Sequence, residues 1–278
     1  MSAANVVRLQ TAAMRATATT RITVEALDKR FKNATADVVA VDNVSFEVKQ
    51  GEFVALLGPS GCGKSTILNM VAGLLPKSGG RIRIDADEVV HGAINRKVGY
   101  VFQRDTVFPW RTVEANIGYG LEIAGIAKPV RAEKVARAIA TAGLAGFEKS
   151  FPRQLSGGMR QRVALMRTLI MEPEILLMDE PFGALDTHTK LEMHKTLLEI
   201  WERERQTVLF VTHDLGEALT LSSRIILLSA RPGRLKEDFA VPFDRPRDPV
   251  ALRGSEEFSR LYSHIWNSLG EEFRRTKA

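Results

Sequence analysis

The stretch of sequence that decides the fold reads Gly58-Pro59-Ser60-Gly61-Cys62-Gly63-Lys64-Ser65-Thr66. It fits the pattern G-x-x-x-x-G-K-[ST], follows the apolar run 53–57, and precedes an expected helix at 64–74. In such a phosphate-binding loop, glycines let backbone N–H groups converge on phosphate oxygens, and the helix N-terminus adds a favourable dipole. We expect Lys64 to bind the β- and γ-phosphates of a nucleotide and the Ser65 hydroxyl to bind Mg²⁺. The alternative is a glycine-rich turn that contains Lys-Ser by chance, and the flanking strand and helix argue against it.

A second element is a short apolar strand that ends in two carboxylates, Ile175-Leu176-Leu177-Met178-Asp179-Glu180. Ligands bind at the carboxyl ends of parallel strands. We therefore expect Asp179 to hold the Mg²⁺ shell and Glu180 to orient the attacking water or accept its proton. A structural pair that caps the next segment is the alternative. Two adjacent carboxylates favour hydrolysis by water over transfer of the phosphoryl group to a substrate hydroxyl.

The arrangement of apolar segments predicts an α/β fold. The runs 175–178, 208–211 and 225–228 show little alternation, as expected for parallel strands buried on both faces. A mostly helical stretch from 112 to 169 interrupts the core, and a helix is expected at 187–204. Including the β-rich start, we expect strands at 22–27, 38–48, 53–57, 81–84, 98–102, 175–178, 208–211 and 225–228.

Charge and composition restrict the classes of partner. The 278 residues carry a net charge of +6, which suggests nucleic acid or an anionic surface. Residues 1–24 hold three arginines and no acid, so they supply +3 of the +6 and leave +3 for the remaining 254 residues. We therefore expect no nucleic-acid partner. We expect residues 1–21 to be a disordered extension, with a transit peptide as the alternative. The single cysteine, Cys62, excludes an internal disulfide and a multi-cysteine zinc site.

The C-terminal region, 241–278, is expected to be a connector followed by an amphipathic helix. Prolines at 242, 246 and 249 mark an extended connector. Ser255 is a plausible N-cap. Packing of this helix on its own domain is favoured over partner binding. The apolar positions at helical spacing are Phe258, Leu261, Tyr262, Ile265, Trp266 and Leu269.

The family resemblance rests on Leu155-Ser156-Gly157-Gly158-Met159-Arg160-Gln161-Arg162, which closely resembles the signature of ABC-type ATPases. The commonest signature reads L-S-G-G-Q, and Met159 replaces its Gln. The phosphate-binding loop, Gln103, the signature, the strand ending in Asp179-Glu180, Ala184-Leu185-Asp186 and His213 stand in the family's order. The resemblance covers about residues 22 to 240. It implies a P-loop NTPase (RecA-like) core with an antiparallel β subdomain and a helical subdomain at about 104–172.

The resemblance also implies roles for individual residues around ATP and Mg²⁺. Gln103 would touch Mg²⁺ and the attacking water, and His213 would contact the γ-phosphate. Phe31 matches the aromatic residue that stacks on adenine, although it fits a core position equally well. Ser156, Gly157 and Gly158 would meet the γ-phosphate held by an opposite subunit, so two copies would enclose two ATP molecules. Asp186 would reach across the interface of this homodimer.

The resemblance further implies a separate ATPase subunit of a multi-chain transporter. No apolar run approaches the ~20 residues needed to span a bilayer, so a permease dimer would supply the membrane passage and the chain would sit peripherally on the cytoplasmic face of the bacterial plasma membrane. The segments 106–121 and 241–269 resemble importers of the nitrate/sulfonate/taurine group, which use an external solute-binding protein. The aromatic segment Phe108-Pro109-Trp110-Arg111-Thr112 is either a docking surface for the permease or a buried structural cluster.

Two rival functions fit the same motifs. One is an ABC ATPase that remodels or regulates another macromolecule and moves no solute. The other is a catalytically idle scaffold that only binds nucleotide, and the intact Asp179, Glu180 and His213 argue against it.

Overall fold

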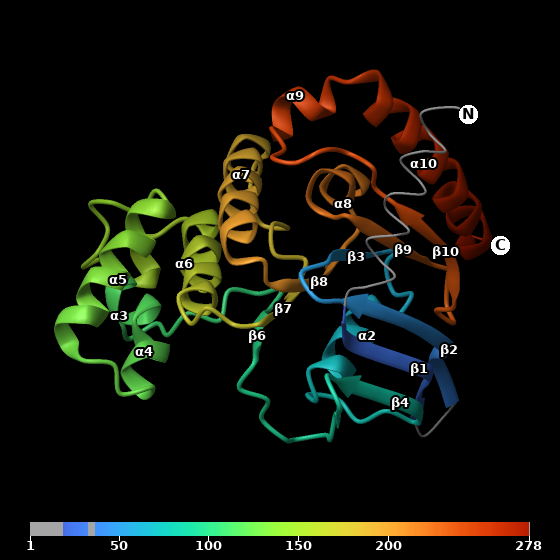
Figure 1. Cartoon of the computed structure of the whole chain (residues 1–278), viewed down its shortest axis with the longest axis horizontal. Coiled ribbons are helices and arrows are strands. Elements are labelled where there is room, and N and C mark those ends of the chain that lie inside the picture. Colours follow the sequence, from blue (N-terminus) through green and yellow to red (C-terminus); the bar gives the residue numbers. More distant parts are fainter. Residues whose placement is uncertain (1–18, 33–36, 278) are drawn as a thin grey trace.

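The computed structural model of the chain describes residues 19–32 and 37–277. Figure 1 shows a central sheet with helices around it, a smaller sheet beside it, and a helical segment at the opposite end of the molecule. Most of the expected extension, residues 1–18, lies outside the described residues. The sequence-based boundary at 22 is two residues late, because Thr20 and Arg21 already belong to a strand that pairs with its neighbour.

The central sheet has six strands in the order β10-β9-β3-β8-β7-β6. The inner strands are parallel, as the continuous apolar runs predicted, and β10 joins the edge antiparallel to β9. This edge strand was not predicted, because its sequence is largely charged and half-exposed. The bounds are β3 (Phe53–Leu57), β6 (Val98–Val101), β7 (Ile175–Asp179), β8 (Thr207–Thr212), β9 (Arg224–Leu228) and β10 (Leu235–Ala240).

Both faces of the inner strands of the central sheet are buried, and β3 shows this directly. Phe53, Ala55 and Leu57 enter one apolar cluster, whereas Val54 and Leu56 enter another on the opposite face. The first cluster is formed with α6 (Gly157–Leu169), α7 (Thr187–Glu204), α8 (Leu215–Leu221) and α10 (Glu256–Lys277). Because successive side chains of a strand point to opposite faces, a strand enclosed by helices on one side and a second layer on the other is apolar throughout.

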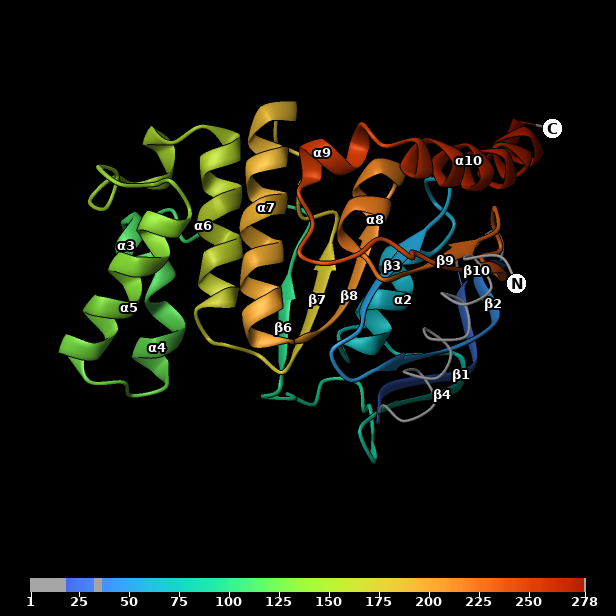
Figure 2. The same cartoon turned by 45° about the horizontal axis from the view of Figure 1, so that its top comes forward.

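The opposite face is covered by α2 (Lys64–Val71) and the small sheet (Figure 2). That sheet is antiparallel with the strand order β2-β1-β4-β5. Helix α2 ends earlier than the expected residue 74, because Gly73 takes a φ of +72°. The strands are β1 (Thr20–Lys32), β2 (Asp37–Lys49), β4 (Gly79–Ile84) and β5 (Asp87–Glu88).

The helical segment between β6 and β7 begins and ends where the sequence predicted. Thr112 caps its first helix by accepting a hydrogen bond from the Ala115 N–H, and its last helix, α6, ends at Leu169. Between these points lie α3 (Val113–Ile117), α4 (Tyr119–Ile123), α5 (Lys128–Thr141) and the short η1 (Pro152–Gln154).

The C-terminal helix packs on its own domain, as favoured from the sequence. Phe258, Ile265 and Leu269 are buried in the main apolar cluster, and the Ser255 hydroxyl caps α10 by accepting from the Phe258 N–H at 3.2 Å. The prediction of an extended connector is wrong for its last part, which is helical. Pro249 begins α9 (Pro249–Arg253), because proline suits the first turn of a helix, where its missing N–H has no partner to lose.

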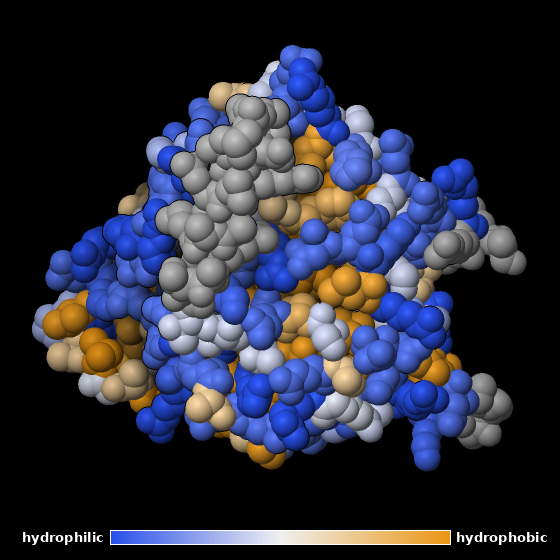
Figure 3. Space-filling view, turned by 45° about the vertical axis from the view of Figure 1, so that its right-hand side comes forward, coloured by the Kyte–Doolittle hydropathy of each residue, from blue (hydrophilic) through white to orange (hydrophobic). Residues whose placement is uncertain are grey.

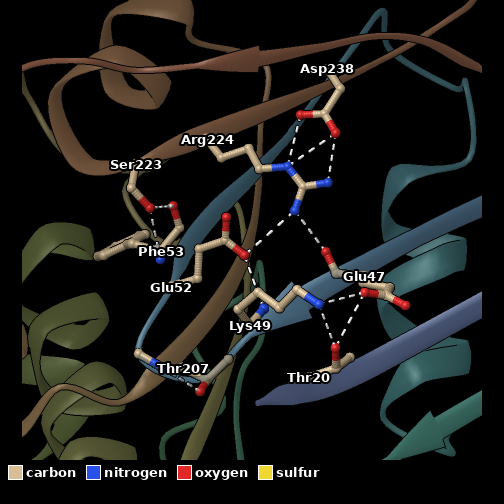
Figure 4. A network of polar contacts seen from close by, with 10 residues as sticks. Thr20, Glu47, Lys49, Glu52, Phe53, Thr207, Ser223, Arg224 and Asp238 are labelled. Atoms are coloured by element: carbon tan, nitrogen blue, oxygen red, sulfur yellow. Dashed lines mark hydrogen bonds and ion pairs between the residues drawn. The ribbon is translucent and has the colours of Figure 1, made fainter. Parts of the chain in front are cut away.

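The small sheet is tied to the central sheet by the network in Figure 4. Arg224 of β9 donates to both oxygens of Asp238 on β10, and its Nη1 donates to the Glu47 carbonyl of β2 at 2.7 Å. Nη1 also lies 3.4 Å from the Glu52 carboxylate. Burial lowers the pKa of this guanidinium, but its bonds to Asp238 and Glu52 outweigh burial and the net shift is upward. Arg224 therefore remains charged at the contact between the two sheets.

The face drawn in Figure 3 is mostly hydrophilic, with apolar side chains in separate groups. Among residues 19–32 and 37–277, no helix combines the length and the apolar composition needed to cross a membrane.

A buried histidine on α7 predicts a pH-dependent stability. His194 is fully buried, packs edge-on against Phe182 at 4.7 Å, and neither ring nitrogen has a hydrogen-bond partner among the described residues. Burial, reinforced by the charge of Arg253, lowers its pKa to about 3. In the unfolded chain this histidine has an ordinary pKa of ~6.5 and binds a proton below that pH, whereas in the folded chain it stays neutral. The free energy of unfolding therefore falls as the pH falls below ~6.5.

We expect the free energy of unfolding to drop by about 2 kcal/mol between about pH 7.5 and pH 5 from this residue alone. Urea denaturation at the two pH values measures the difference. His194→Leu should remove most of it, whereas His188→Gln, an exposed position on the same helix, should leave it in place. An unchanged pH dependence in His194→Leu would contradict the assignment.

Candidate functional site

The candidate site is a pocket of about 520 Å³ at the carboxyl ends of the central strands. It gathers residues from the small sheet, from the start of α2 and from the loops after β3, β6, β7, β8 and β9. Ten residues singled out in the sequence line it: Phe31, Ser60, Gly61, Gly63, Lys64, Ser65, Thr66, Gln103, Glu180 and His213. Val38, Ala40 and Arg231 complete the lining.

The phosphate-binding loop is shaped by glycines that another residue could not replace. Gly61 and Gly63 have φ of +76° and +100°, in the left-handed region. A Cβ on Gly63 would also lie 2.8 Å from the Ala40 carbonyl oxygen, closer than such atoms approach. The loop then enters α2 at Lys64, so the first N–H groups of that helix, which have no partner within it, face the pocket side of the loop.

The Lys64 ammonium is held inside the loop. It is 5 % exposed, and its Nζ donates to the carbonyl oxygens of Gly58 at 2.8 Å and Pro59 at 2.9 Å. Cys62 is buried beside it, and burial raises the pKa of this thiol. Cys62 is therefore a packing residue of the loop, and its burial favours the neutral thiol.

Ser65 and Asp179 bring two oxygens together beneath the loop. The Ser65 hydroxyl donates to Asp179 Oδ1 at 2.7 Å. Burial raises the pKa of Asp179, and the bond from Ser65 offsets part of that shift. A bound cation would favour the ionised form of this carboxyl. A hydroxyl and a carboxylate at this place fit Mg²⁺, which binds a few protein oxygens together with phosphate oxygens and water.

Glu180 lies between the two other residues expected to act in hydrolysis. Its Oε1 is 3.1 Å from His213 Nδ1, and its Oε2 accepts a hydrogen bond from Gln103 Nε2 at 3.1 Å. The three residues follow β7, β8 and β6, which are neighbours in the sheet order. Glu180 itself has a φ of +45°, and its N–H donates to the Val211 carbonyl. Parallel strand pairing thus places a carboxylate, an imidazole and an amide at one edge of the pocket.

Phe31 lines the pocket from β1, where it pairs with Val38 of β2, another lining residue. The residue is 37 % exposed, and Lys29 Nζ lies 4.8 Å from the centre of its ring. A residue with this exposure is not a core side chain, so the core alternative raised by the sequence is wrong.

The signature residues do not line this pocket. Ser156 caps α6 by accepting from the Met159 N–H at 3.2 Å, and Gly157 and Gly158 form the first turn. Asp186 caps α7 through Thr189, whose hydrogen bonds lower the pKa of the Asp186 carboxyl. One chain thus presents the signature helix apart from its own phosphate-binding loop (Figures 1 and 2).

Two contacts and one pocket residue near the site were missed by sequence reasoning. Arg160 of the signature helix pairs with Asp105 at 2.8 Å, two residues after Gln103. Gln161 Nε2 donates to the Pro181 carbonyl at 2.8 Å. Arg231 lines the pocket from the loop after β9. No local pattern marks a lone arginine in a loop, so only its position in space identifies it.

The chain is similar to known ABC proteins across most of its length. Residues 41–183 match the family described as ABC transporter. An uncharacterized ABC transporter ATP-binding protein of Methanocaldococcus jannaschii is 47% identical over 252 residues, which is 91% of this chain and 92% of the relative. The aliphatic sulfonates import ATP-binding protein SsuB of Bacillus cereus is 41% identical over 244 residues, 88% of this chain and 94% of the relative.

The fold is also similar to that of a solved dimer. The ATP-binding cassette MJ0796, solved in a dimeric post-hydrolysis state bound to ADP and Pi, is 31% identical with a TM-score of 0.72, covering 79% of this chain and 98% of that one. The pocket with its phosphate-binding loop and carboxylates, together with these similarities, leads to one conclusion: the chain belongs to the ABC transporter family and is an ATPase cassette that binds ATP with Mg²⁺.

Proposed function

We propose that the chain is the ATP-hydrolysing subunit of a multi-chain importer, which couples ATP binding and hydrolysis to uptake of a small solute through a partner permease. The observation that carries the hydrolytic part is the position of Glu180 between Gln103 and His213, in the same pocket as Lys64. This arrangement favours an active ATPase over an idle nucleotide-binding scaffold.

In this proposal the pocket binds ATP from base to γ-phosphate. Phe31 stacks on adenine, and residues 58–66 surround the phosphates through backbone N–H groups and the Lys64 ammonium. Ser65, Asp179 and Gln103 would supply the protein oxygens that hold Mg²⁺, and the bound cation would add charge stabilisation at the phosphates.

Glu180 acts as the general base. Its carboxylate accepts a proton from water as the water oxygen bonds to the γ-phosphorus and the bond to the β-phosphate oxygen breaks, which releases ADP. The contacts to His213 and Gln103 hold the carboxylate in place for this step. His213 is also placed to contact the γ-phosphate.

A second copy of the chain completes the site. Ser156, Gly157 and Gly158 offer a hydroxyl and unpaired helix N–H groups to an anion, and in one chain they do not line the pocket. A head-to-tail homodimer would place them on the γ-phosphate bound by the partner, with Asp186 near the interface. The dimeric form of the similar cassette supports this assembly.

The helical segment is the proposed contact with a permease dimer. Trp110 is 71 % exposed, although Phe108 packs against Tyr119 and Arg167. The aromatic segment is thus partly structural, and Trp110 is the side chain available for docking. We place the subunit peripherally on the cytoplasmic face of the bacterial plasma membrane. Its proposed parts are an ATPase domain that begins with β1 at residue 20 and ends at 240, with a helical subdomain at about 104–172, and a C-terminal region at 241–278.

The proposed solute is a sulfonate, taurine or nitrate, delivered by an external solute-binding protein. The support is the likeness to an aliphatic sulfonates import protein over 88% of the chain. The test is to purify the tagged chain with its permease from detergent-solubilised membranes and reconstitute both in vesicles with the binding protein.

We expect ATPase activity to rise several-fold when the binding protein carries an alkanesulfonate, taurine or nitrate. Stimulation by none of these anions would contradict the solute class. If no permease copurifies and a soluble macromolecule does, the rival function of remodelling that macromolecule replaces transport.

A further inference from the structure

Arg231 lies on the wall of the nucleotide pocket but belongs to none of the motifs. It is exposed, in the loop between β9 and β10, and shares the pocket with Phe31, Ala40 and Lys64. Within residues 19–32 and 37–277, its guanidinium has neither an ion pair nor a hydrogen bond.

The other cations of the same hairpin are all paired. Arg224 binds Asp238, Arg234 Nε donates to Asp42 at 2.9 Å, and Lys236 lies 3.0 Å from Glu272. The three cations of the hairpin that do not line the pocket are therefore paired with carboxylates, whereas Arg231, beside the phosphate-binding loop, is unpaired. An unpaired guanidinium next to a pocket built for phosphates is available to an anionic ligand.

The loop that carries Arg231 is packed tightly on the pocket wall. The Gly233 N–H donates to the Ala40 carbonyl, and the Gly233 carbonyl accepts from the Asp42 N–H, both at 3.0 Å. A Cβ on Gly233 would lie 2.0 Å from the Cys62 carbonyl oxygen. The backbone thus touches both strand β2 and the phosphate-binding loop.

The C-terminal helix holds the other side of this loop. Glu272 of α10 is 1 % exposed, and its Oε2 accepts a hydrogen bond from the Ala230 N–H at 2.8 Å. The backbone is therefore fixed one residue before Arg231 as well as two residues after it.

The strand order determines which end of the nucleotide Arg231 can reach. The phosphate-binding loop follows β3, with β9 on one side and β8, β7 and β6 on the other. Glu180, His213 and Gln103 come from the latter side, whereas Arg231 comes from β9. Arg231 therefore approaches from the side away from those three residues, where its loop bonds to Ala40 through the Gly233 N–H and where Phe31 pairs with Val38 of the same strand β2.

We propose that Arg231 binds the α-phosphate of the nucleotide and so contributes equally to the affinity for ATP and ADP. The inference rests on the proposed position of the nucleotide in this pocket. A guanidinium can donate two hydrogen bonds to one phosphate, in addition to those from the loop.

The test is calorimetric titration of the full chain with MgADP, and with MgATP in a Glu180→Gln background that prevents turnover. We expect Arg231→Ala to weaken both nucleotides by about tenfold, with the ratio of the two affinities unchanged. The loss should shrink at about 0.5 M salt, because an exposed charged contact is screened. Arg231→Lys should bind both nucleotides with an affinity between those of Arg231→Ala and the parent, since the charge remains but the two-pronged hydrogen bonding is lost.

Arg234→Ala is the matched control, because it removes the same charge from the same loop at a residue that does not line the pocket. Its ADP affinity should equal that of the parent. The proposal is overturned if Arg231→Ala binds both nucleotides normally, if Arg234→Ala shows the same loss, or if ATP alone is weakened. Lys64→Ala tests the pocket itself: normal ADP binding in that variant would contradict the proposed nucleotide position independently of Arg231.

Discussion

Glu180→Gln should reduce steady-state ATP hydrolysis by about a thousandfold, the usual contribution of a general base. The amide keeps the size of the side chain and can still hydrogen-bond to Gln103 and His213, which lie 3.1 Å from the two carboxylate oxygens. It cannot accept the proton of the attacking water. ATP binding should therefore persist, and the variant should remain in a closed, ATP-bound dimer.

Two measurements check this result. Phosphate release reports turnover, and size-exclusion chromatography with and without MgATP reports the dimer. Glu192→Gln is the matched control, because it makes the same change at an exposed residue of α7, and it should hydrolyse ATP like the parent. Parent-like hydrolysis in Glu180→Gln would exclude Glu180 as the base. Loss of ATP binding would assign it a binding role instead.

Lys64→Ala should weaken ATP binding by about a hundredfold or more, which corresponds to roughly 3 kcal/mol. The ammonium is buried and already directed into the loop by the carbonyls of Gly58 and Pro59. A charge desolvated in this way interacts strongly with a phosphate, so its loss removes much of the binding energy. Hydrolysis should fall because the site remains empty at ordinary ATP concentrations.

Equilibrium binding of a fluorescent ATP analogue measures the effect. Thermal unfolding of the same variant shows whether the loop, now without a donor for two carbonyls, still supports a folded domain. Lys77→Ala, which removes a partly exposed lysine paired with Glu88 outside the nucleotide pocket, should bind ATP normally. A folded Lys64→Ala with parent-like affinity would show that the nucleotide phosphates lie elsewhere.

The elements that were predicted correctly are determined by residues close together in the sequence. The phosphate-binding loop combines glycines, a lysine and a helix start within nine residues. Strand β7 is apolar throughout because both of its faces are buried, and it ends at the expected carboxylates. Ser255 caps α10, and Thr112 caps α3, by bonds that span three residues.

The elements that the sequence did not predict depend on contacts with residues far away in the chain, or on burial that only the folded structure shows. Strand β10 is half-exposed and charged, so it becomes a strand only by pairing with β9. Pro249 reads as a chain breaker, yet Asp248 caps the helix that it begins. Phe31 fits a core position or a binding surface equally well by sequence, and its exposure distinguishes them.

The sequence by itself determined the chemistry: an α/β nucleotide site with its lysine, carboxylates and signature in the family's order. Short-range patterns suffice there, because each motif carries its own backbone geometry. The tertiary structure decided which side chains meet. Parallel pairing of β6, β7 and β8 brings Gln103, Glu180 and His213 together, although 110 residues separate the first from the last. It also brought Arg231 to the pocket and buried His194, because packing between distant segments depends on the whole fold.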